Sequence, residues 1–195
     1  RDIIQRRMWA TIELAIGGWA FAILLGIPTG VLAAVKRGTF WDYIGRGVAI
    51  VGQGAPPFVI GLLLIVIFAV WLQDTPFELP AAGRPPKFSI KTYILPCIAL
   101  GWPAAAGLMR LTRSAMLEVL DSEFVKLARA KGVGWNKVIY KHALKNALIT
   151  PLTSALLLFS GWLNGALVIE IIFGWPGIGY DALFTAVNDN DFPLL

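Results

Sequence analysis

Four long stretches of this chain carry no charged residue, and segments rich in basic residues separate them. The uncharged stretches cover residues 14–35, 47–73, 92–109 and 146–169. A helix needs roughly 20 residues to cross the hydrocarbon core of a membrane. Because only a helix satisfies its own backbone hydrogen bonds in lipid, the pattern predicts four membrane-spanning helices.

We place these predicted spans at residues 10–35, 48–71, 92–111 and 149–173. Prolines inside them predict kinks or breaks, at Pro28, Pro56, Pro57, Pro96 and Pro103. Pairs of glycines four residues apart would allow close helix packing, at Gly26 and Gly30 and at Gly161 and Gly165. The chain starts with Arg1 and ends in "DFPLL", which resembles the start of a further span. We therefore expect one transmembrane domain over residues 1–195, truncated at both ends.

The composition supports an all-α polytopic membrane protein. Hydrophobic residues make up 57% of the 195 residues and charged residues 15%. Soluble domains contain about 45–50% apolar and about 25% charged residues. We therefore interpret the net charge of +5 loop by loop, as charge in the segments between membrane spans. It does not indicate a nucleic-acid partner.

Basic residues are distributed unequally between the two sides of the predicted membrane. Eleven fall on the side of residues 36–46 and 110–145, and six on the other side. The positive-inside rule places the eleven in the cytoplasm. Residues 72–91 and 173–193 are then external.

The chain lacks the residue sets of common enzymes. It has no phosphate-binding Gly-x-x-x-x-Gly-Lys-Ser/Thr loop, and no pair of acids lies inside one span. His142 is its only histidine and Cys97 its only cysteine, so a metal cluster or an intrachain disulfide is not expected. We expect no catalytic residue, no metal and no bound cofactor in this chain.

Residues 126–146, "KLARAKGVGWNKVIYKHALKN", form a basic segment between two predicted spans. Asp121 and Ser122 can cap a helix that stops at Gly132. A second helix can start at Gly134 or Asn136 and run into the fourth span, with one cationic stripe. That stripe consists of Lys137, Lys141 and Lys145. A basic helix lying on anionic lipid would explain the lysines but not the fold-back at "KGVG".

This segment resembles the cytoplasmic EAA loop of permease subunits of bacterial and archaeal ABC importers. Aligned on Gly132, the chain keeps Ala128 and Leu144 of the general pattern but departs from it at Lys126, Leu127, His142 and Lys145. The departures match the dipeptide/oligopeptide/nickel branch. "GIPTGVLAAVKRGTFWD" and "VIEIIFGWPGIG" also resemble that branch, in particular its B-type permease.

The resemblance implies an ABC type I importer transmembrane domain with four full spans here and the start of another. In such importers two permeases, here expected as a heterodimer, form the pore. Two cytoplasmic ATPases use ATP and Mg²⁺, and an extracytoplasmic binding protein delivers substrate. The EAA loop, here residues 117–146, docks on the ATPase. The implied docking residues are Ala128, Arg129, Ala130, Lys131, Gly132 and Val133. The expected location is the plasma membrane of a bacterium or archaeon.

Polar or helix-breaking residues at membrane depth suggest a translocation pathway. The candidates are Gln53, Pro56, Pro57, Asn164 and Glu170. A kink packed against a neighbour, or a structural role for Glu170, explains the same residues. The external "GWPGIG" predicts a re-entrant or docking turn at Trp175, Pro176, Gly177 and Gly179, with Trp175 suited to the membrane interface.

Two other classes of membrane protein remain open at this stage. An ATP-independent channel or secondary transporter would need intramembrane ion ligands or inverted repeats, and neither is evident. A membrane-anchored scaffold would explain the basic loop but not four kinked spans. The cargo stays open among dipeptides, oligopeptides, nickel complexes and sugars.

Overall fold

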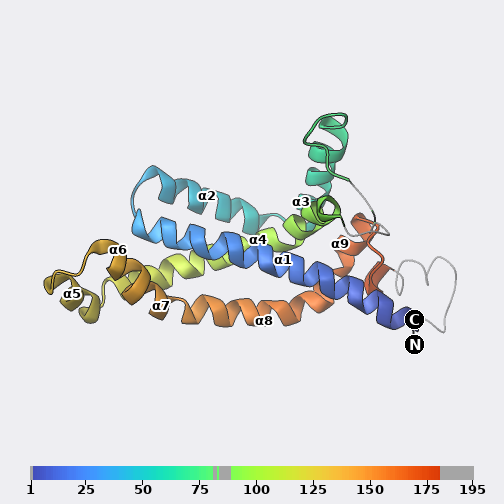
Figure 1. The fold of residues 1–195 in the computed structure, drawn as a ribbon. Helices are drawn as coiled ribbons and strands as arrows, with labels where there is room; N and C mark the ends of the chain where they lie inside the picture. Colours follow the sequence, from blue (N-terminus) through green and yellow to red (C-terminus); the bar gives the residue numbers. More distant parts are fainter. Residues whose placement is uncertain (1, 81–82, 84–88, 181–195) are drawn as a thin grey trace. The chain divides into compact units, whose positions relative to one another are not determined.

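The computed structural model describes all residues except 1, 81–82, 84–88 and 181–195, with backbone only at 2–6 and 163–165. No strand occurs in this described part of the chain. The helices are α1 (Asp2–Val35), α2 (Phe40–Gly54), α3 (Pro57–Ile65), η1 (Val66–Trp71), α4 (Ile90–Leu120), α5 (Glu123–Ala130), α6 (Trp135–Lys137), η2 (Val138–Ala143), α7 (Leu144–Ala147), α8 (Ile149–Gly165) and α9 (Leu167–Ile172) (Figure 1). The elements η1 and η2 are π-helices.

Helices occupy each range for which the sequence predicts a span. Two of them, Arg7–Val35 within α1 and Ile90–Leu120, are long and apolar enough to cross a membrane. Two bent pairs, Phe40–Gly54 with Pro57–Trp71 and Trp135–Ala147 with Ile149–Trp162, raise the number to four if each pair is one span. The span boundaries stay predictions.

The prolines act differently at different sites. Pro56 precedes α3 and Pro57 occupies its first turn, where a missing N–H costs no helical hydrogen bond. A break therefore falls between α2 and α3, as predicted. Pro28, Pro96 and Pro103 lie inside helices that continue through them.

The chain divides into two compact units, and the long helices α1 and α4 contribute residues to both. The first unit contains residues 1–21, 55–103 and 159–195. In its core the first half of α1 packs on the first half of α4, and Gly61 of α3 lies against Phe173 and Ala99. The buried core residues are Ala10, Leu14, Leu95, Cys97, Ala99, Leu100, Ala166, Ile169, Phe173 and Trp175.

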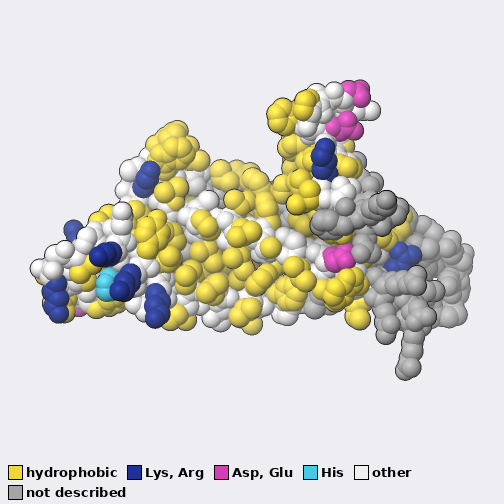
Figure 2. Space-filling model, in the orientation of Figure 1, with side chains coloured by type: hydrophobic (Ala, Val, Ile, Leu, Met, Phe, Trp, Pro, Cys, Tyr) yellow, Lys and Arg dark blue, Asp and Glu magenta, His cyan; other side chains and the backbone are white. Residues whose placement is uncertain are grey.

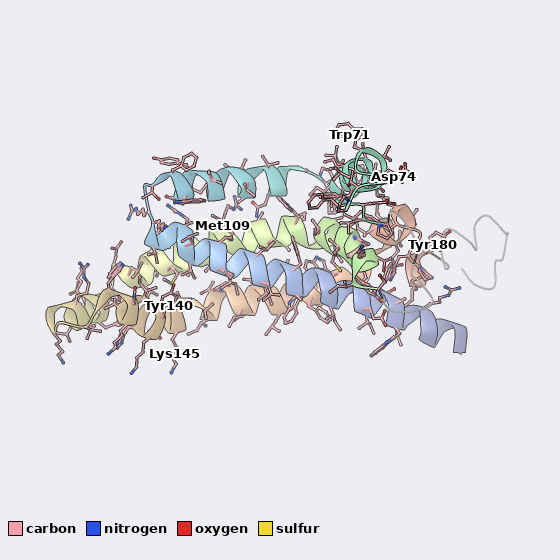
Figure 3. The ribbon with its side chains drawn as sticks, turned by 45° about the horizontal axis from the view of Figure 1, so that its top comes forward. Trp71, Asp74, Met109, Tyr140, Lys145 and Tyr180 are labelled. Atoms are coloured by element: carbon pink, nitrogen blue, oxygen red, sulfur yellow. The ribbon has the colours of Figure 1, made fainter. Side chains whose placement is uncertain are left out.

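The second unit contains residues 22–54 and 104–158. Here α2 runs beside the second half of α1 and contacts α4 (Figure 1). Met109 of α4 lies against Gly45 of α2, and a buried cluster joins it to Ala33, Ala49 and Ala106 (Figure 3). Small side chains therefore let three helices approach closely.

One of the two predicted glycine pairs lies at a helix contact. A Cβ on Gly26 would lie 2.6 Å from the Ala105 carbonyl oxygen, and one on Gly30 would lie 2.6 Å from that of Met109. A Cβ on Gly161 would meet nothing within 4 Å in this chain, and Gly165 lies outside the residues whose side-chain surroundings are described.

The packing of α1 on α4 predicts the effect of adding one methyl group. A Cβ on Gly101 would lie 2.5 Å from the Gly18 carbonyl oxygen and 2.8 Å from Phe21 Cδ1. Gly101→Ala should therefore destabilise the protein by about 1–3 kcal/mol, because overpacking forces the helices apart. The midpoint of thermal unfolding in detergent measures this effect.

Gly161→Ala is the matched control for this prediction. A Cβ at Gly161 meets nothing within 4 Å, and alanine favours a helix over glycine by about 1 kcal/mol. We expect its unfolding midpoint to stay or rise. Equal decreases in both variants would contradict the role of the α1–α4 contact.

Candidate functional site

The basic elbow between α5 and α6 has a defined backbone geometry. Gly132 has φ +79°, a left-handed conformation that costs other L-residues about 1–2 kcal/mol. Its N–H donates to the Arg129 carbonyl at 2.9 Å, and the N–H of Val133 donates to the Ala128 carbonyl at 3.2 Å. This pair of bonds is a Schellman motif. Gly132 therefore ends α5, as the sequence predicts.

The start of α5 differs from the prediction in its cap. Ser122 occupies the N-cap position with extended backbone but makes no side-chain cap. Its hydroxyl donates to the Val119 carbonyl at 2.5 Å instead. The predicted capping hydrogen bond from Ser122 is therefore wrong, because the preceding turn takes the hydroxyl.

A cation–π contact joins α5 to α6 across the elbow. The Arg129 guanidinium lies 5.1 Å from the centre of the Trp135 ring, and Gly134 starts α6 in an extended conformation. Arg129 therefore has an intramolecular partner in addition to the docking role that the resemblance implies.

The implied docking residues lie together on this elbow and are accessible. Arg129, Ala130, Lys131 and Gly132 are exposed, and Ala128 and Val133 are half-buried. A Cβ on Gly132 would meet nothing within 4 Å, so the space in front of the elbow is open in this chain.

Sequence reasoning missed an apolar part of the same surface. Phe124 is 45% exposed, Leu127 56% and Trp135 45%. The signal was present: Phe124 and Leu127 are three residues apart on a short helix, so they share a face. Large apolar side chains grouped beside charges are typical of protein interaction sites.

The charge of this surface is almost entirely positive. Glu123 pairs with Lys126 at 2.8 Å, and this carboxylate raises the pKa of the lysine ammonium. Residues 124–169 contain no acid. Figure 2 shows the dark blue side chains gathered over α5 to α7.

The arm formed by η2 and α7 connects the elbow to the core of the second unit. Ile139, Ala143 and Ala147 pack in one buried cluster with Val31 of α1 and Met116 of α4. Tyr140 and Lys145 point outward (Figure 3). Buried contacts therefore connect the elbow, through this arm, to the ends of α1 and α4.

The predicted lysine stripe runs from the end of α6 along this arm, with a spacing that differs from the prediction. Lys137, Lys141 and Lys145 are all exposed. The α-helical repeat assumed for them does not hold across η2, because a π-helix closes its hydrogen bonds over five residues.

A buried ion pair lies in the same unit. Asp42 of α2 is 1% exposed, and Arg113 of α4 donates to both of its carboxylate oxygens, at 2.8 and 3.0 Å. The Gly38 N–H donates to Asp42 at 3.0 Å, and Arg46 lies 3.4 Å away. Sequence reasoning missed this pair, since nothing in the order of residues brings positions 42 and 113 together.

The predicted pathway residues at the break between α2 and α3 are exposed. Gln53 in α2 is exposed, as are Pro56 and Pro57. The Pro56 carbonyl accepts from the N–H groups of Val59 and Ile60. Asn164 lies in α8, but its side chain is outside the described part of the structure. A pathway role for these residues stays a prediction.

Glu170 is enclosed by protein. It is fully buried, and its Oε1 accepts from the Thr11 hydroxyl at 2.6 Å. Its Oε2 accepts from the backbone N–H groups of Gly179 at 2.8 Å and Tyr180 at 3.3 Å. This arrangement favours the structural role that the sequence left open for Glu170, because the carboxylate holds a turn to α1.

The glycines of this turn are required by the same carboxylate. A Cβ on Gly177 would overlap the Glu170 carboxyl group, and one on Gly179 would lie 2.9 Å from its Oε2. The turn is also tied to α1 through Pro176, whose carbonyl accepts from Arg7 at 3.4 Å. The "GWPGIG" turn is thus packed against α1 over its described residues.

Trp175 departs from its predicted environment. We expected it at the membrane interface, but its side chain is fully buried in the first unit. Its indole N–H donates to the Ala10 carbonyl at 3.0 Å, and its ring makes an edge contact with Tyr93 at 4.7 Å. Trp175 is therefore a core residue, with both its apolar ring and its polar N–H satisfied.

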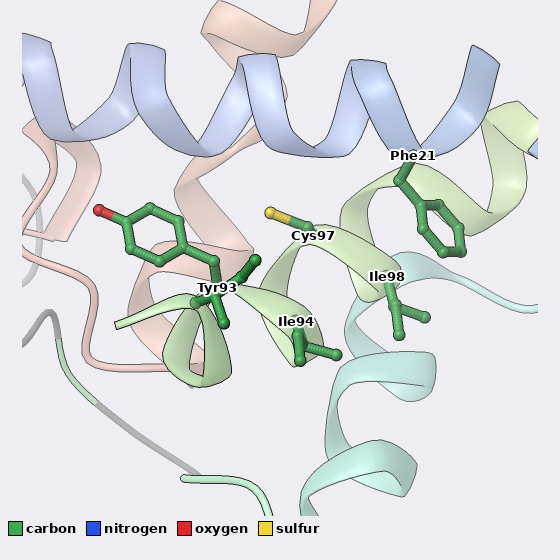
Figure 4. Close-up of a pocket in the computed structure, with 6 residues that line it drawn as sticks. Phe21, Tyr93, Ile94, Cys97 and Ile98 are labelled. Carbon is green, nitrogen blue, oxygen red and sulfur yellow. The ribbon is translucent and has the colours of Figure 1, made fainter. Parts of the chain in front are cut away.

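An open apolar hollow of about 340 Å³ lies in the first unit, lined by Phe21 of α1 and by α4 (Figure 4). Its lining from α4 consists of Ile90, Tyr93, Ile94, Cys97 and Ile98. The Tyr93 hydroxyl donates to Glu13 at 2.9 Å. The lining offers no charge to hold a peptide terminus, so we assign no cargo to it. Among the described residues no group of His, Cys, Asp or Glu could hold a metal.

Comparison with known families and proteins gives matches over the whole chain. The family described as "Binding-protein-dependent transport system inner membrane component" matches residues 26–194. The dipeptide transport system permease protein of Alkalihalophilus pseudofirmus is 41% identical over 98% of this chain and 65% of its own length. The oligopeptide transport system permease protein of Salmonella typhimurium is 37% identical over 100% of this chain and 61% of its own. This chain therefore spans less than two thirds of either relative.

Two solved structures share the fold. An amino acid ABC transporter crystallised with histidines matches with TM-score 0.72 and 14% identity, over 97% of this chain and 80% of that one. The inward-facing MetNI methionine ABC transporter matches with TM-score 0.70 and 18% identity, over 98% and 88%. The expected fold, that of an ABC importer transmembrane domain, is thereby confirmed.

The backbone of the elbow predicts different effects for two neighbouring glycines. Gly132→Ala should cost about 1–2 kcal/mol, because φ +79° is unfavourable for alanine. Gly134→Ala should cost little, because Gly134 has φ −60° and ψ 144°, which alanine adopts freely. Hydrogen exchange of the Val133 amide should accelerate roughly tenfold in the first variant only, 1.4 kcal/mol being a factor of ten. Unchanged exchange in Gly132→Ala would contradict this geometry.

The Glu170 network predicts graded losses of stability. Glu170→Ala should lower the free energy of unfolding by about 3 kcal/mol, since each buried donor left unpaired costs about 1–3 kcal/mol. Glu170→Gln should lose less, because one acceptor oxygen remains. The exposed Glu118 supplies the control, with a change within about 0.5 kcal/mol for Glu118→Ala. Unfolding in denaturant measures all three, and equal losses would exclude a specific role for the network.

Proposed function

Because this chain belongs to the family of binding-protein-dependent transport system inner membrane components, we propose that it forms half of the pore of an ATP-driven importer. The other half is a second permease subunit. Two cytoplasmic ATPases bind ATP and Mg²⁺, and a separate binding protein delivers the cargo outside. The named relatives are transport permease subunits, which supports a transport role without catalysis by this chain.

The proposed cargo is a peptide. Relatives that match the chain at 37–41% identity carry names of dipeptide and oligopeptide transport systems, and another that of a glutathione transport system. The described hollow is apolar and offers no charged group for a peptide terminus, so we do not assign selection among these peptides to it. We propose that the binding protein makes this selection.

The single observation that carries the coupling role is the open elbow at residues 123–137. It contains exposed apolar side chains, exposed cations and a left-handed glycine within a short segment. An apolar surface with positive charge fits a groove with an acidic rim on the ATPase. The arm behind it packs on α1 and α4, so docking there can move the spans as rigid bodies.

The distribution of charge supports the orientation that we propose. Eleven of the 17 basic residues fall on the side of the elbow, which supports a cytoplasmic elbow by the positive-inside rule. We place the protein in the plasma membrane of a bacterium or archaeon. A channel or secondary transporter is not favoured, because the family consists of components of binding-protein-dependent systems.

The docking role predicts that a large side chain at Gly132 reduces uptake more than the backbone strain of a small side chain does. Gly132→Ala carries the cost of the left-handed conformation, and Gly132→Trp adds a large side chain to the open space before the elbow. We expect uptake of a radiolabelled dipeptide by vesicles containing the whole importer to fall to background in the tryptophan variant and only partly in the alanine variant. Normal uptake by Gly132→Trp, at normal membrane levels, would remove the support for docking.

A further inference from the structure

The second unit contains one buried carboxylate, that of Asp42, which binds donors from α4 and from the turn before α2. Asp42 is 1% exposed and lies in the first turn of α2. Arg113 of α4 binds both carboxylate oxygens, and the Gly38 N–H binds Oδ2 from the turn before α2. A two-pronged guanidinium–carboxylate contact fixes both distance and orientation.

Helix packing alone does not explain why this position holds a charge pair. The contact of α2 with α4 is already made by Ala49, Ala106 and Met109. Replacing a buried ion pair by well-packed apolar residues is often neutral or stabilising, whereas removing one partner is costly. We therefore interpret the pair as fixing the register of α2 against α4, and not as a net contribution to the stability of their packing.

Its position connects the coupling arm with the far end of α2. Met116, which packs against Ile139 and Ala143 of the arm, is one helical turn beyond Arg113 on α4. Gln53 is three turns beyond Asp42 on the same helix α2. Beside the apolar packing of α2 on α4, the ion pair is thus a contact of fixed geometry that can pass a movement of the end of α4 on to α2.

We propose that Asp42 and Arg113 are positioning residues that make α2 follow α4 when the elbow moves, so that ATP-driven motion reaches Gln53. This inference rests on the proposed function, in which an ATPase moves the elbow. The pair itself contacts neither ATPase nor cargo. Without the pair, the arm still moves but α2 no longer follows it.

The test compares two labelled positions in the assembled, full-length importer. Fluorescent labels are placed on exposed residues, at Tyr140→Cys on the arm and at Val48→Cys on α2, in a Cys97→Ala background. The fluorescence change on adding ATP, Mg²⁺ and vanadate is recorded for each label. This measurement needs no knowledge of the cargo.

In the importer that keeps Asp42 and Arg113, we expect the fluorescence of both labels to change when ATP, Mg²⁺ and vanadate are added. In Asp42→Asn the arm label should respond normally, and the α2 response should fall at least about fivefold, the lower end of typical coupling between sites. Arg113→Lys keeps the charge but loses the two-pronged contact, so its α2 response should be intermediate. The exchanged pair Asp42→Arg with Arg113→Asp should restore the α2 response.

Arg46→Gln is the matched control. Arg46 also lies near Asp42, at 3.4 Å, but its side chain is 41% exposed, and exposed pairs contribute little. Both labels should respond normally in this variant. An equal loss of α2 response in Arg46→Gln would show a general effect of charge and overturn the proposal.

The remaining outcomes distinguish failure of the positioning role of Asp42 and Arg113 from failure of the coupling to an ATPase. A normal α2 response in Asp42→Asn overturns the positioning role and leaves the proposed function standing. Failure of Asp42→Asn and Arg113→Lys to assemble, without restoration by the exchanged pair, shows a role in folding only and also overturns it. If neither label responds in the unaltered pair, the ATPase coupling itself fails, and the inference fails with it.

Discussion

The structure depends on the close approach of α1 and α4, which lipid alone would not enforce. Apolar side chains gain little by leaving lipid for protein, so helices associate through close packing and a few polar contacts. Gly18 and Gly101 provide this packing in the first unit, and Gly26 and Gly30 provide it in the second. Methyl groups at these positions would overlap backbone atoms or side chains of the partner helix. Since both helices extend through both units, the remaining elements of each unit are built onto this pair.

In each unit, buried polar contacts hold a further segment against α1 or α4. In the first unit, Glu170 and Trp175 bind α1 through Thr11 and the Ala10 carbonyl, and fix the "GWPGIG" turn. In the second unit, Asp42 binds Arg113 and fixes α2 on α4. A buried carboxylate is costly unless every oxygen is paired. Glu170 and Asp42 therefore specify one arrangement of their neighbours, whereas the surrounding apolar contacts would tolerate several.

Much of the fold followed from local patterns in the sequence. Apolar runs predicted the helices, Pro56 and Pro57 the break before α3, and Gly132 the end of α5, because each depends on residues near in sequence. The contacts of Asp42, Thr11 and Tyr93 depend on residues 71 to 159 positions away, and no periodicity predicts such pairs. The sequence could not predict the buried position of Trp175 either. Its amphipathic side chain fits a membrane surface as well as a buried site with one hydrogen-bond acceptor. Only the fold brings the Ala10 carbonyl to its indole N–H.

The coupling role that we propose requires the elbow between α5 and α6 to dock on an ATPase. The most direct test places a photo-cross-linking amino acid at the exposed Leu127 in the full-length protein in native membranes, with Leu157 of α8, also exposed, as the comparison position. Mass spectrometry then identifies the attached peptides. If the elbow docks as proposed, Leu127 attaches to a Walker-motif ATPase and Leu157 does not. Attachment of Leu127 only to lipid or to another copy of this chain would contradict it.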